Sequence, residues 1–160
     1  MANSKKDTVL ILCDIRSVHN VGSIFRTADT CGVSKIYLVG VTPTPKDRFG
    51  RTRKDLAKVA LGAEKNIPWE KAESSLEVLK NLKKEGFQII SIEQSKNSVD
   101  YKTVSAKEKA AFVLGGEVDG LPESVLKLSD VVAEIPMKGK KESLNVSVAT
   151  GIALFRILEI

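Results

Sequence analysis

The sequence of 160 residues predicts one α/β domain, a mostly parallel sheet with helices on both faces. Short apolar runs rich in branched residues alternate with segments of helical periodicity along the chain. The strand-like runs are apolar at consecutive positions, which is typical of parallel strands buried on both faces. The length suffices for one core, and two domains would each be marginal. No repeat, low-complexity segment or linker divides the chain.

Each element follows from a local pattern. The first strand is predicted at residues 8–14, TVLILCD, and a helix starting at Val21 is ended by Gly32. Leu76, Leu79 and Leu82 mark the inner side of an amphipathic helix. Further strands are predicted at residues 35–41, 66–72, 86–93, 110–116 and 131–137, and helices at residues 53–61, 73–84 and 122–130.

The last segment, KESLNVSVATGIALFRILEI, covers residues 141–160 and predicts a helix that is apolar on nearly every side. A surface helix buries one stripe only, so this helix needs cover all round. It opens with two small polar residues, Ser143 and Asn145. Capping explains one of them, but it does not explain two that flank a leucine.

The composition, 42% hydrophobic and 28% charged, indicates a soluble globular protein. No apolar run approaches the ~20 residues of a membrane span, and MANSKKD lacks the hydrophobic region of a signal peptide. We therefore expect a cytoplasmic protein with no membrane partner. Two cysteines and one histidine give neither a disulfide framework nor metal-ligand spacing, so Cys13 and Cys31 are predicted as buried thiols and no metal is expected.

Positive charge is concentrated at residues 46–54, KDRFGRTRK, where five cations face one carboxylate and supply most of the net charge of +5. A solvated loop would account for a charged segment. A contact with a phosphate backbone accounts better for the near-neutrality of the rest of the chain. The predicted RNA-binding residues are Lys46, Arg48, Arg51, Arg53, Lys54 and, from another loop, Lys138.

Ligands of parallel sheets bind beyond the carboxyl ends of the strands. In the first such loop, Asn20 could cap the helix and Gly22 could allow close packing. Arg26 is either a surface cation or, on the first helical turn, part of an anion site. A later loop, GGEVDGLP, has Gly115, Gly116 and Gly120, which let the backbone approach a ligand. Its spacing is neither a dinucleotide fingerprint nor a Walker A loop.

Three segments of the sequence, taken together, resemble the motifs of a known protein family. NVGSIFR, FVLGGEVDGLP and IPMKGKKESLNVSVA resemble, in order, the three motifs of the SpoU (TrmH-type) RNA methyltransferases of the SPOUT superfamily. The resemblance extends over residues 8–160, and the SLNVSVATGIALF form of the third motif is highly specific. It implies a C-terminal deep trefoil knot, S-adenosylmethionine as methyl donor, an RNA ribose 2′-hydroxyl as acceptor, and a homodimer whose subunits share the active site.

The resemblance also implies roles for single residues. It places Arg26 at the acceptor ribose with Asn20 holding it. Because a guanidinium loses its proton only above pH ~12, a cation that lowers the pKa of the hydroxyl is easier to defend than a general base. The implied catalytic residues are Asn20, Arg26, Glu117, Ser143 and Asn145, and the implied cofactor-binding residues are Leu114, Gly115, Gly116, Gly120, Ile135, Met137 and Leu144.

Two different classes of protein compete with this assignment. The chain could be a binding module of the same fold that holds RNA or the cofactor without turnover. A dehydrogenase would need a glycine fingerprint after Asp14, which IRSVHNVGS does not supply. We expect residues 1–160 to form a single SpoU-type domain, with residues 1–7 as a polar lead and no separate RNA-binding domain. Whether the substrate is tRNA or rRNA is left open.

Overall fold

The computed structural model describes residues 6–160, which form one seven-stranded sheet of order β3-β2-β1-β6-β4-β7-β5. Every pair of neighbouring strands is parallel. The strands are β1 (Asp7–Cys13), β2 (Lys35–Val39), β3 (Trp69–Ala72), β4 (Gln88–Ile92), β5 (Val99–Asp100), β6 (Lys109–Gly115) and β7 (Val131–Glu134). The helices are α1 (Val18–Thr30), α2 (Lys54–Ala60), α3 (Ala63–Asn66), α4 (Ser75–Lys84), the 3-10 helix η1 (Tyr101–Thr103), α5 (Glu123–Leu128) and α6 (Val146–Leu158).

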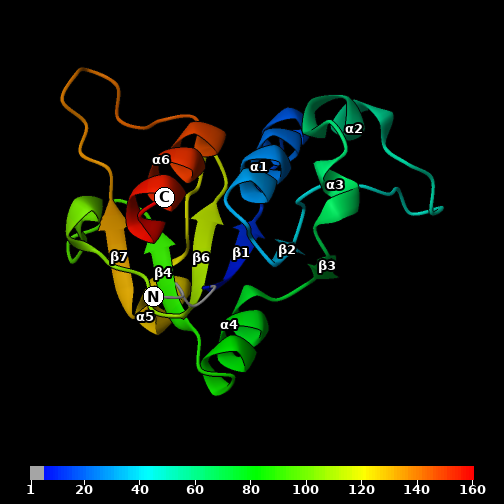
Figure 1. Cartoon of the computed structure of the whole chain (residues 1–160). Coiled ribbons are helices and arrows are strands. Elements are labelled where there is room, and N and C mark those ends of the chain that lie inside the picture. Colours follow the sequence, from blue (N-terminus) through cyan, green and yellow to red (C-terminus); the bar gives the residue numbers. More distant parts are fainter. Residues whose placement is uncertain (1–5) are drawn as a thin grey trace.

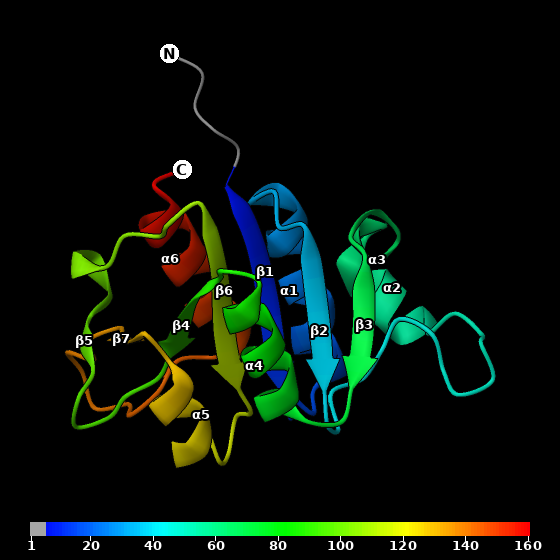
Figure 2. The same cartoon turned by 90° about the horizontal axis from the view of Figure 1, so that it is seen from below.

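Helices cover the sheet on both faces, as the continuous apolar strands predict. Leu10 and Leu12 of β1 belong to one buried cluster, with residues of α1, α2 and α6. Val9 and Ile11 belong to a second cluster, with residues of α4 and α5. Figure 2 shows α1 and α6 on one side of the sheet and α4 and α5 on the other. The predicted α/β class is confirmed.

The register of the central strands brings the important loops to one edge. Cys13 at the end of β1 pairs with Gly115 at the end of β6. Ile92 at the end of β4 lies opposite Ala133 near the end of β7. The loops that follow these strands therefore emerge side by side at the carboxyl edge. The loop after β7, orange in Figure 1, returns over this edge into α6.

Helix α1 begins one turn earlier than predicted. The hydroxyl of Ser17 accepts a hydrogen bond from the backbone N–H of Asn20, at 3.1 Å, so Ser17 is the N-cap and Asn20 is not. With Val18 as the first helical residue, Arg26 lies on the third turn rather than the first. The expectation that Arg26 sits at the helix N-terminus is wrong. The expected close packing at Gly22 is confirmed, since an added Cβ would lie 2.9 Å from Val59 Cβ.

Helix α6 is covered on one side rather than all round. Ala153, Leu154 and Ile157 are buried in the same core cluster as residues of α1 and the central strands. Val148 and Phe155 are 49% and 41% exposed. One chain therefore does not cover the whole apolar surface of this helix, and the predicted cover on all sides would need a second subunit.

Three short elements were not predicted: α3, β5 and η1. They are too short for an apolar period to develop. The last strand ends at Glu134, and not at residue 137 as predicted. Ile135 and Met137 are apolar because they line a cavity, and a cavity wall gives the same pattern as a strand.

Both cysteines are free thiols; Cys13 is buried and Cys31 is half-buried. Burial raises the pKa of the Cys13 thiol to about 12, with a smaller contribution from Asp14, and raises that of Cys31 to about 11. Both are therefore uncharged at neutral pH. Within residues 6–160, no helix is long and apolar enough to cross a membrane.

Candidate functional site

A cavity of about 680 Å³ opens at the carboxyl edge, between the loop after β6 and the segment that connects β7 to α6. Both segments were predicted to carry the site. The lining includes all the residues implied as cofactor contacts and three of those implied as catalytic: Leu114, Gly115, Gly116, Gly120, Ile135, Met137, Leu144, Glu117, Ser143 and Asn145. Two segments separated in sequence by residues 121–134 thus form one pocket.

The lining combines apolar walls with negative charge. Its apolar side chains in the two predicted segments include Leu114, Ile135, Met137 and Leu144. Its charged side chains are all carboxylates, Glu93, Glu117, Asp119 and Glu142, with no lysine or arginine among the described residues that line it. Such a pocket favours a ligand with a flat apolar part and a positive charge, because opposite charges attract more strongly away from bulk water.

The glycines of the loop are also required by the fold itself, apart from the predicted approach of the backbone to a ligand. A Cβ on Gly115 would lie 2.5 Å from the carbonyl carbon of Gly120, and one on Gly116 would collide with the Asp14 carbonyl oxygen. Gly120 has φ +62°, and its Cβ would lie 2.6 Å from Glu93 Oε2. The loop needs glycine in order to fold against its own neighbours, so these positions hold the shape of the cavity wall.

A chain of side-chain hydrogen bonds ties the three motifs together. Asn20 Nδ2 donates to Glu117 Oε1 at 2.9 Å, and Asn145 Nδ2 donates to Asn20 Oδ1 at 3.1 Å. Asn145 Oδ1 also caps α6, because it accepts the backbone N–H of Ser147 at 2.9 Å. Asn145 is therefore the cap, whereas Ser143 is exposed at the cavity. Asn20 is buried between two residues that line the cavity.

Glu117 is held as a carboxylate by this arrangement. Partial burial raises its pKa, but hydrogen bonds from Asn20 and from the backbone of Glu117, Arg16 and Ser17 lower it by more. The pKa of Glu117 therefore lies below the ordinary 4.5. At neutral pH this residue accepts hydrogen bonds and carries a negative charge.

Arg26 lies outside this network. Its side chain is exposed on α1, and no hydrogen bond or ion pair of its guanidinium occurs within residues 6–160. The expected contact between Asn20 and Arg26 is absent there. The reason is geometric, because six residues along a helix turn the side chain to another side. Asn20 faces Glu117 and Asn145 instead.

The loop after β4, where Ile92, Glu93 and Gln94 complete the cavity, was not predicted from the sequence. Glu93 Oε2 accepts the backbone N–H of Leu121 at 2.9 Å. Gln94 Nε2 donates to the carbonyl oxygen of Glu142 at 2.9 Å. Glu93 thus supports the wall formed by the loop after β6, and Gln94 supports the wall formed by the segment between β7 and α6. The signal was available, since residues 86–93 were predicted as a strand whose carboxyl end must reach the same edge.

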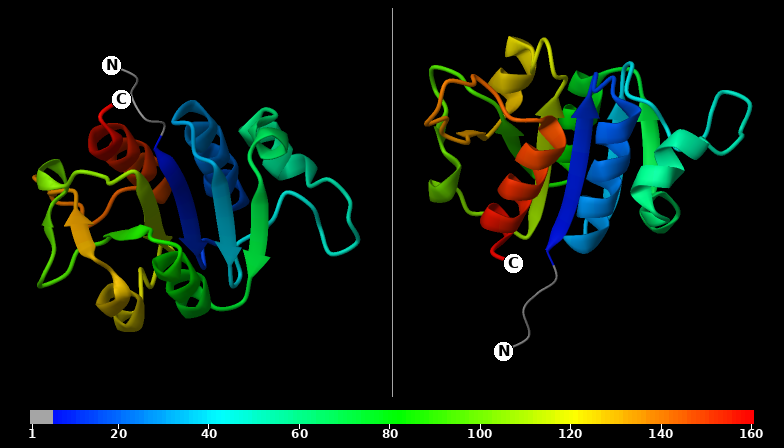
Figure 3. Two further views of the ribbon diagram at one scale, coloured as in Figure 1. Left: turned by 60° about the horizontal axis from the view of Figure 1, so that its bottom comes forward. Right: turned by 90° about the horizontal axis from the view of Figure 1, so that it is seen from above.

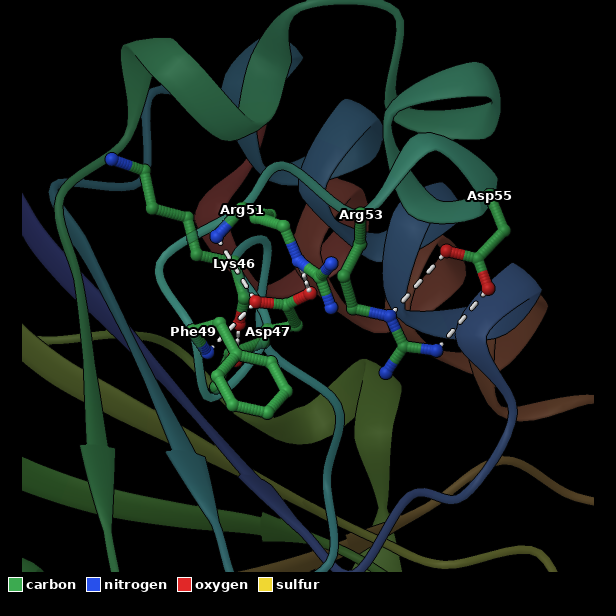
Figure 4. A network of polar contacts seen from close by, with 7 residues as sticks. Lys46, Asp47, Phe49, Arg51, Arg53 and Asp55 are labelled. Carbon is green, nitrogen blue, oxygen red and sulfur yellow. Dashed lines mark hydrogen bonds and ion pairs between the residues drawn. The ribbon is translucent and has the colours of Figure 1, made fainter.

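The basic segment, residues 46–54, forms a small hairpin that projects beside α2, cyan in Figure 3. Within the hairpin, the Asp47 carboxylate forms an ion pair with Arg51 Nε at 2.9 Å. Arg53 pairs with Asp55 at 3.2 Å, as Figure 4 shows. Among the other RNA-binding candidates, Lys46, Arg48, Lys54 and Lys138 are exposed and form no ion pair within the described part of the chain.

Comparison with known proteins agrees with this geometry. Residues 7–155 match the model of the SpoU rRNA Methylase family. A tRNA (guanosine(18)-2′-O)-methyltransferase of Aquifex aeolicus is 32% identical over 94% of this chain and 68% of its own length. A Staphylococcus saprophyticus protein assigned to the TrmH family of tRNA/rRNA methyltransferases is 34% identical over 98% of this chain.

Solved structures give the same result. An AdoMet-bound rRNA methyltransferase from Sinorhizobium meliloti superimposes with a TM-score of 0.86 at 30% identity, over 98% of this chain and 57% of that one. The chain spans about 60% of the length of the Staphylococcus saprophyticus relative. From the family match, the sequence relatives and the shared fold, we conclude that the chain belongs to the SpoU rRNA methylase family.

Proposed function

We propose that the protein transfers a methyl group from S-adenosylmethionine to a ribose 2′-hydroxyl of tRNA or rRNA. The observation that carries the proposal is the acidic, apolar-walled cavity formed by the second and third motifs. The Aquifex aeolicus relative, named as a 2′-O-methyltransferase of tRNA, supports the ribose as acceptor.

The residues of the cavity suit this cofactor. Leu114, Ile135, Met137 and Leu144 would enclose the adenine, and the shaped backbone of residues 115–120 would lie against it. The four carboxylates of the lining complement a ligand that carries sulfonium and ammonium charges. When bound, S-adenosylmethionine supplies a methyl group already activated by the positive sulfur, so the protein mainly contributes alignment.

The chain's own residues would prepare the acceptor. A 2′-hydroxyl is a weak nucleophile at neutral pH, so its proton must be withdrawn or the developing alkoxide stabilised. The exposed Arg26 would pair with the neighbouring phosphate and stabilise that negative charge. Ser143 would line the acceptor side, while Asn20 keeps Glu117 and Asn145 in place.

The exposed cations of residues 46–54, helped by Lys138, would bind the RNA backbone. Arg51 and Arg53 already share their charge with Asp47 and Asp55. We therefore expect Lys46, Arg48 and Lys54 to dominate the salt dependence of binding.

The exposed Val148 and Phe155 on α6 support a homodimer, because burying this face against a second subunit would remove apolar surface from water. The trefoil knot implied by the family resemblance stays a prediction. A cytoplasmic location is likewise proposed.

The test is to incubate the protein with bulk RNA and methyl-labelled S-adenosylmethionine, and to digest the product to nucleosides for mass spectrometry. Label on a 2′-O-methylnucleoside is the expected result. Label on a base would overturn the ribose assignment. Retained binding of RNA and cofactor with no transfer would instead identify a binding module.

A further inference from the structure

One feature of the basic hairpin has no part in neutralising phosphates. Phe49 stands at its turn with 67% of its surface exposed, more than any other phenylalanine among residues 6–160. The guanidinium carbons of Arg48 and Arg51 lie over its ring, each 4.9 Å from the centroid. An exposed apolar residue is ordinary by itself. An exposed ring flanked by two cations is a more specific arrangement.

The turn that presents this ring is held in one shape. Gly50 N–H donates to the Asp47 carbonyl oxygen at 2.9 Å, which closes a β-turn with Phe49 at its third position. The Asp47 carboxylate accepts the backbone N–H groups of Phe49, at 2.8 Å, and Arg51, at 3.0 Å. Asp47 N–H also donates to the Arg51 carbonyl oxygen at 2.8 Å. Because the backbone of this turn is already ordered, presenting the ring to a ligand costs little backbone conformational entropy.

The hairpin also has a suitable place in the fold. It follows β2, and only β1 separates β2 from β6, whose loop forms the cavity wall. Since all these strands are parallel, both loops leave the same edge of the sheet. The loops start about 10 Å apart, because two spacings between neighbouring strands separate β2 from β6. The N-terminus of α1, which follows β1, lies between them. The hairpin itself projects from the β3 side of the sheet (Figure 3), so an RNA strand bound there would extend along the carboxyl edge to reach the cavity.

We propose that Phe49 is a stacking platform for an unpaired base of the RNA, with Arg48 and Lys46 on the adjoining phosphates. The inference rests on the proposed function and narrows its substrate class to an exposed loop, bulge or single strand. Aromatic platforms beside cations bind single strands because every unstacked base has a free π-face. A continuous duplex hides those faces and would meet only the cations.

The test compares the affinities of Phe49→Ala and wild type for oligouridylate and for a blunt RNA duplex. Stacking is worth about 1–3 kcal/mol per base, so oligouridylate should bind the variant roughly 5- to 150-fold more weakly. Duplex affinity should be unchanged, because no base is free to stack. The salt dependence should also be unchanged, whereas Arg48→Gln should reduce its slope by about one. Phe49→Trp should restore binding.

Leu61→Ala is the matched control, because Leu61 is 65% exposed but not aromatic and lies outside the hairpin. An equal loss for Leu61→Ala, or equal losses for duplex and single strand, would overturn the platform. So would a Phe49→Ala effect seen only on phosphatidylserine vesicles, which would identify a membrane contact. These binding assays need no methyl transfer, so failure of the catalytic proposal would be seen separately in the labelling experiment.

Discussion

Asn20 connects the three motifs, because its buried side chain donates a hydrogen bond to Glu117 and accepts one from Asn145. From the sequence alone, Asn20 is predicted as a helix cap or as a residue that holds Arg26. The sequence indicates which polar residues matter, because they stand at strand ends. It does not indicate which of them are in contact. Ser17 caps α1, so the helix begins one turn before the predicted start, and Asn20 lies within the helix on the side that faces the glycine loop.

The proposed catalytic role of Arg26 can be tested alone, because its exposed side chain forms no hydrogen bond or ion pair within residues 6–160. Arg26→Ala should lower the rate of methyl transfer by at least 100-fold, which is the scale of losing one charge-stabilising group. Calorimetric affinity for S-adenosylmethionine and the melting temperature should stay near wild type. If transfer, cofactor affinity and melting temperature fall together, Arg26 supports the fold instead.

The Asn20 link predicts a pH effect on stability. In the wild type, the lowered pKa of Glu117 adds stability that is fully present above about pH 4.5 and is lost as the pH falls through the folded-state pKa. In Asn20→Asp, a second carboxylate replaces the amide donor and raises the pKa of the pair. The variant should lose about 2 kcal/mol at pH 7, the scale of a hydrogen bond to a charged group.

Part of that loss should return near pH 4, when one of the two carboxylates takes a proton. Denaturant melts of both proteins at the two pH values would measure it. A loss independent of pH would mean that the missing Nδ2–H donor causes the destabilisation, and not repulsion between two carboxylates.

At the scale of elements, the strands were predictable because short continuous apolar runs between polar residues are typical of buried strands. The ends of strands and the burial of helices were less predictable where residues are apolar for a reason other than packing in the core of this chain. Ile135 and Met137 line a cavity although their pattern predicts a strand, and Val148 and Phe155 are exposed although their segment predicts complete burial. The sequence pattern shows which side chains are apolar, but the residues or cavity that each of them contacts depend on the tertiary structure.

Two helical glycines make a matched pair for testing the packing of α1. Gly22→Ala would place a Cβ 2.9 Å from Val59 Cβ and 3.0 Å from the Leu56 carbonyl oxygen. Gly151→Ala in α6 would meet only Thr27 Cγ2, at an ordinary 3.7 Å. Alanine gains about 1 kcal/mol of helix propensity over glycine at both sites.

We expect Gly151→Ala to stabilise the protein by up to about 1 kcal/mol, and Gly22→Ala to destabilise it by about 1–3 kcal/mol, because overpacking forces α2 away from α1. Chemical denaturation would give both free energies of unfolding. Equal stabilisation of the two variants would show that α2 shifts without cost and that the close approach at Gly22 is incidental.

At the scale of the whole molecule, the cavity and the uncovered side of α6 both involve the chain's last segment. Ile135, Met137 and residues 142–146 line the pocket, and α6 begins at Val146. One side of α6 packs on α1 and the sheet, whereas Val148 and Phe155 are exposed. A second subunit against this side would hold the start of α6, and therefore Asn145 and the pocket wall, in place. Dimerisation and cofactor binding should then be coupled.

Phe155→Lys tests this coupling. Placing a charge in a buried apolar contact should weaken the dimer at least tenfold, which sedimentation velocity measured over a concentration series would detect. Leu61→Lys is the control, because Leu61 is similarly apolar and 65% exposed but lies at the end of α2. If the coupling is real, the monomeric Phe155→Lys protein should also bind S-adenosylmethionine more weakly, although residue 155 does not line the cavity. A Phe155→Lys protein that remains dimeric would place the interface elsewhere, and a monomer with full cofactor affinity would show that one chain completes the pocket alone.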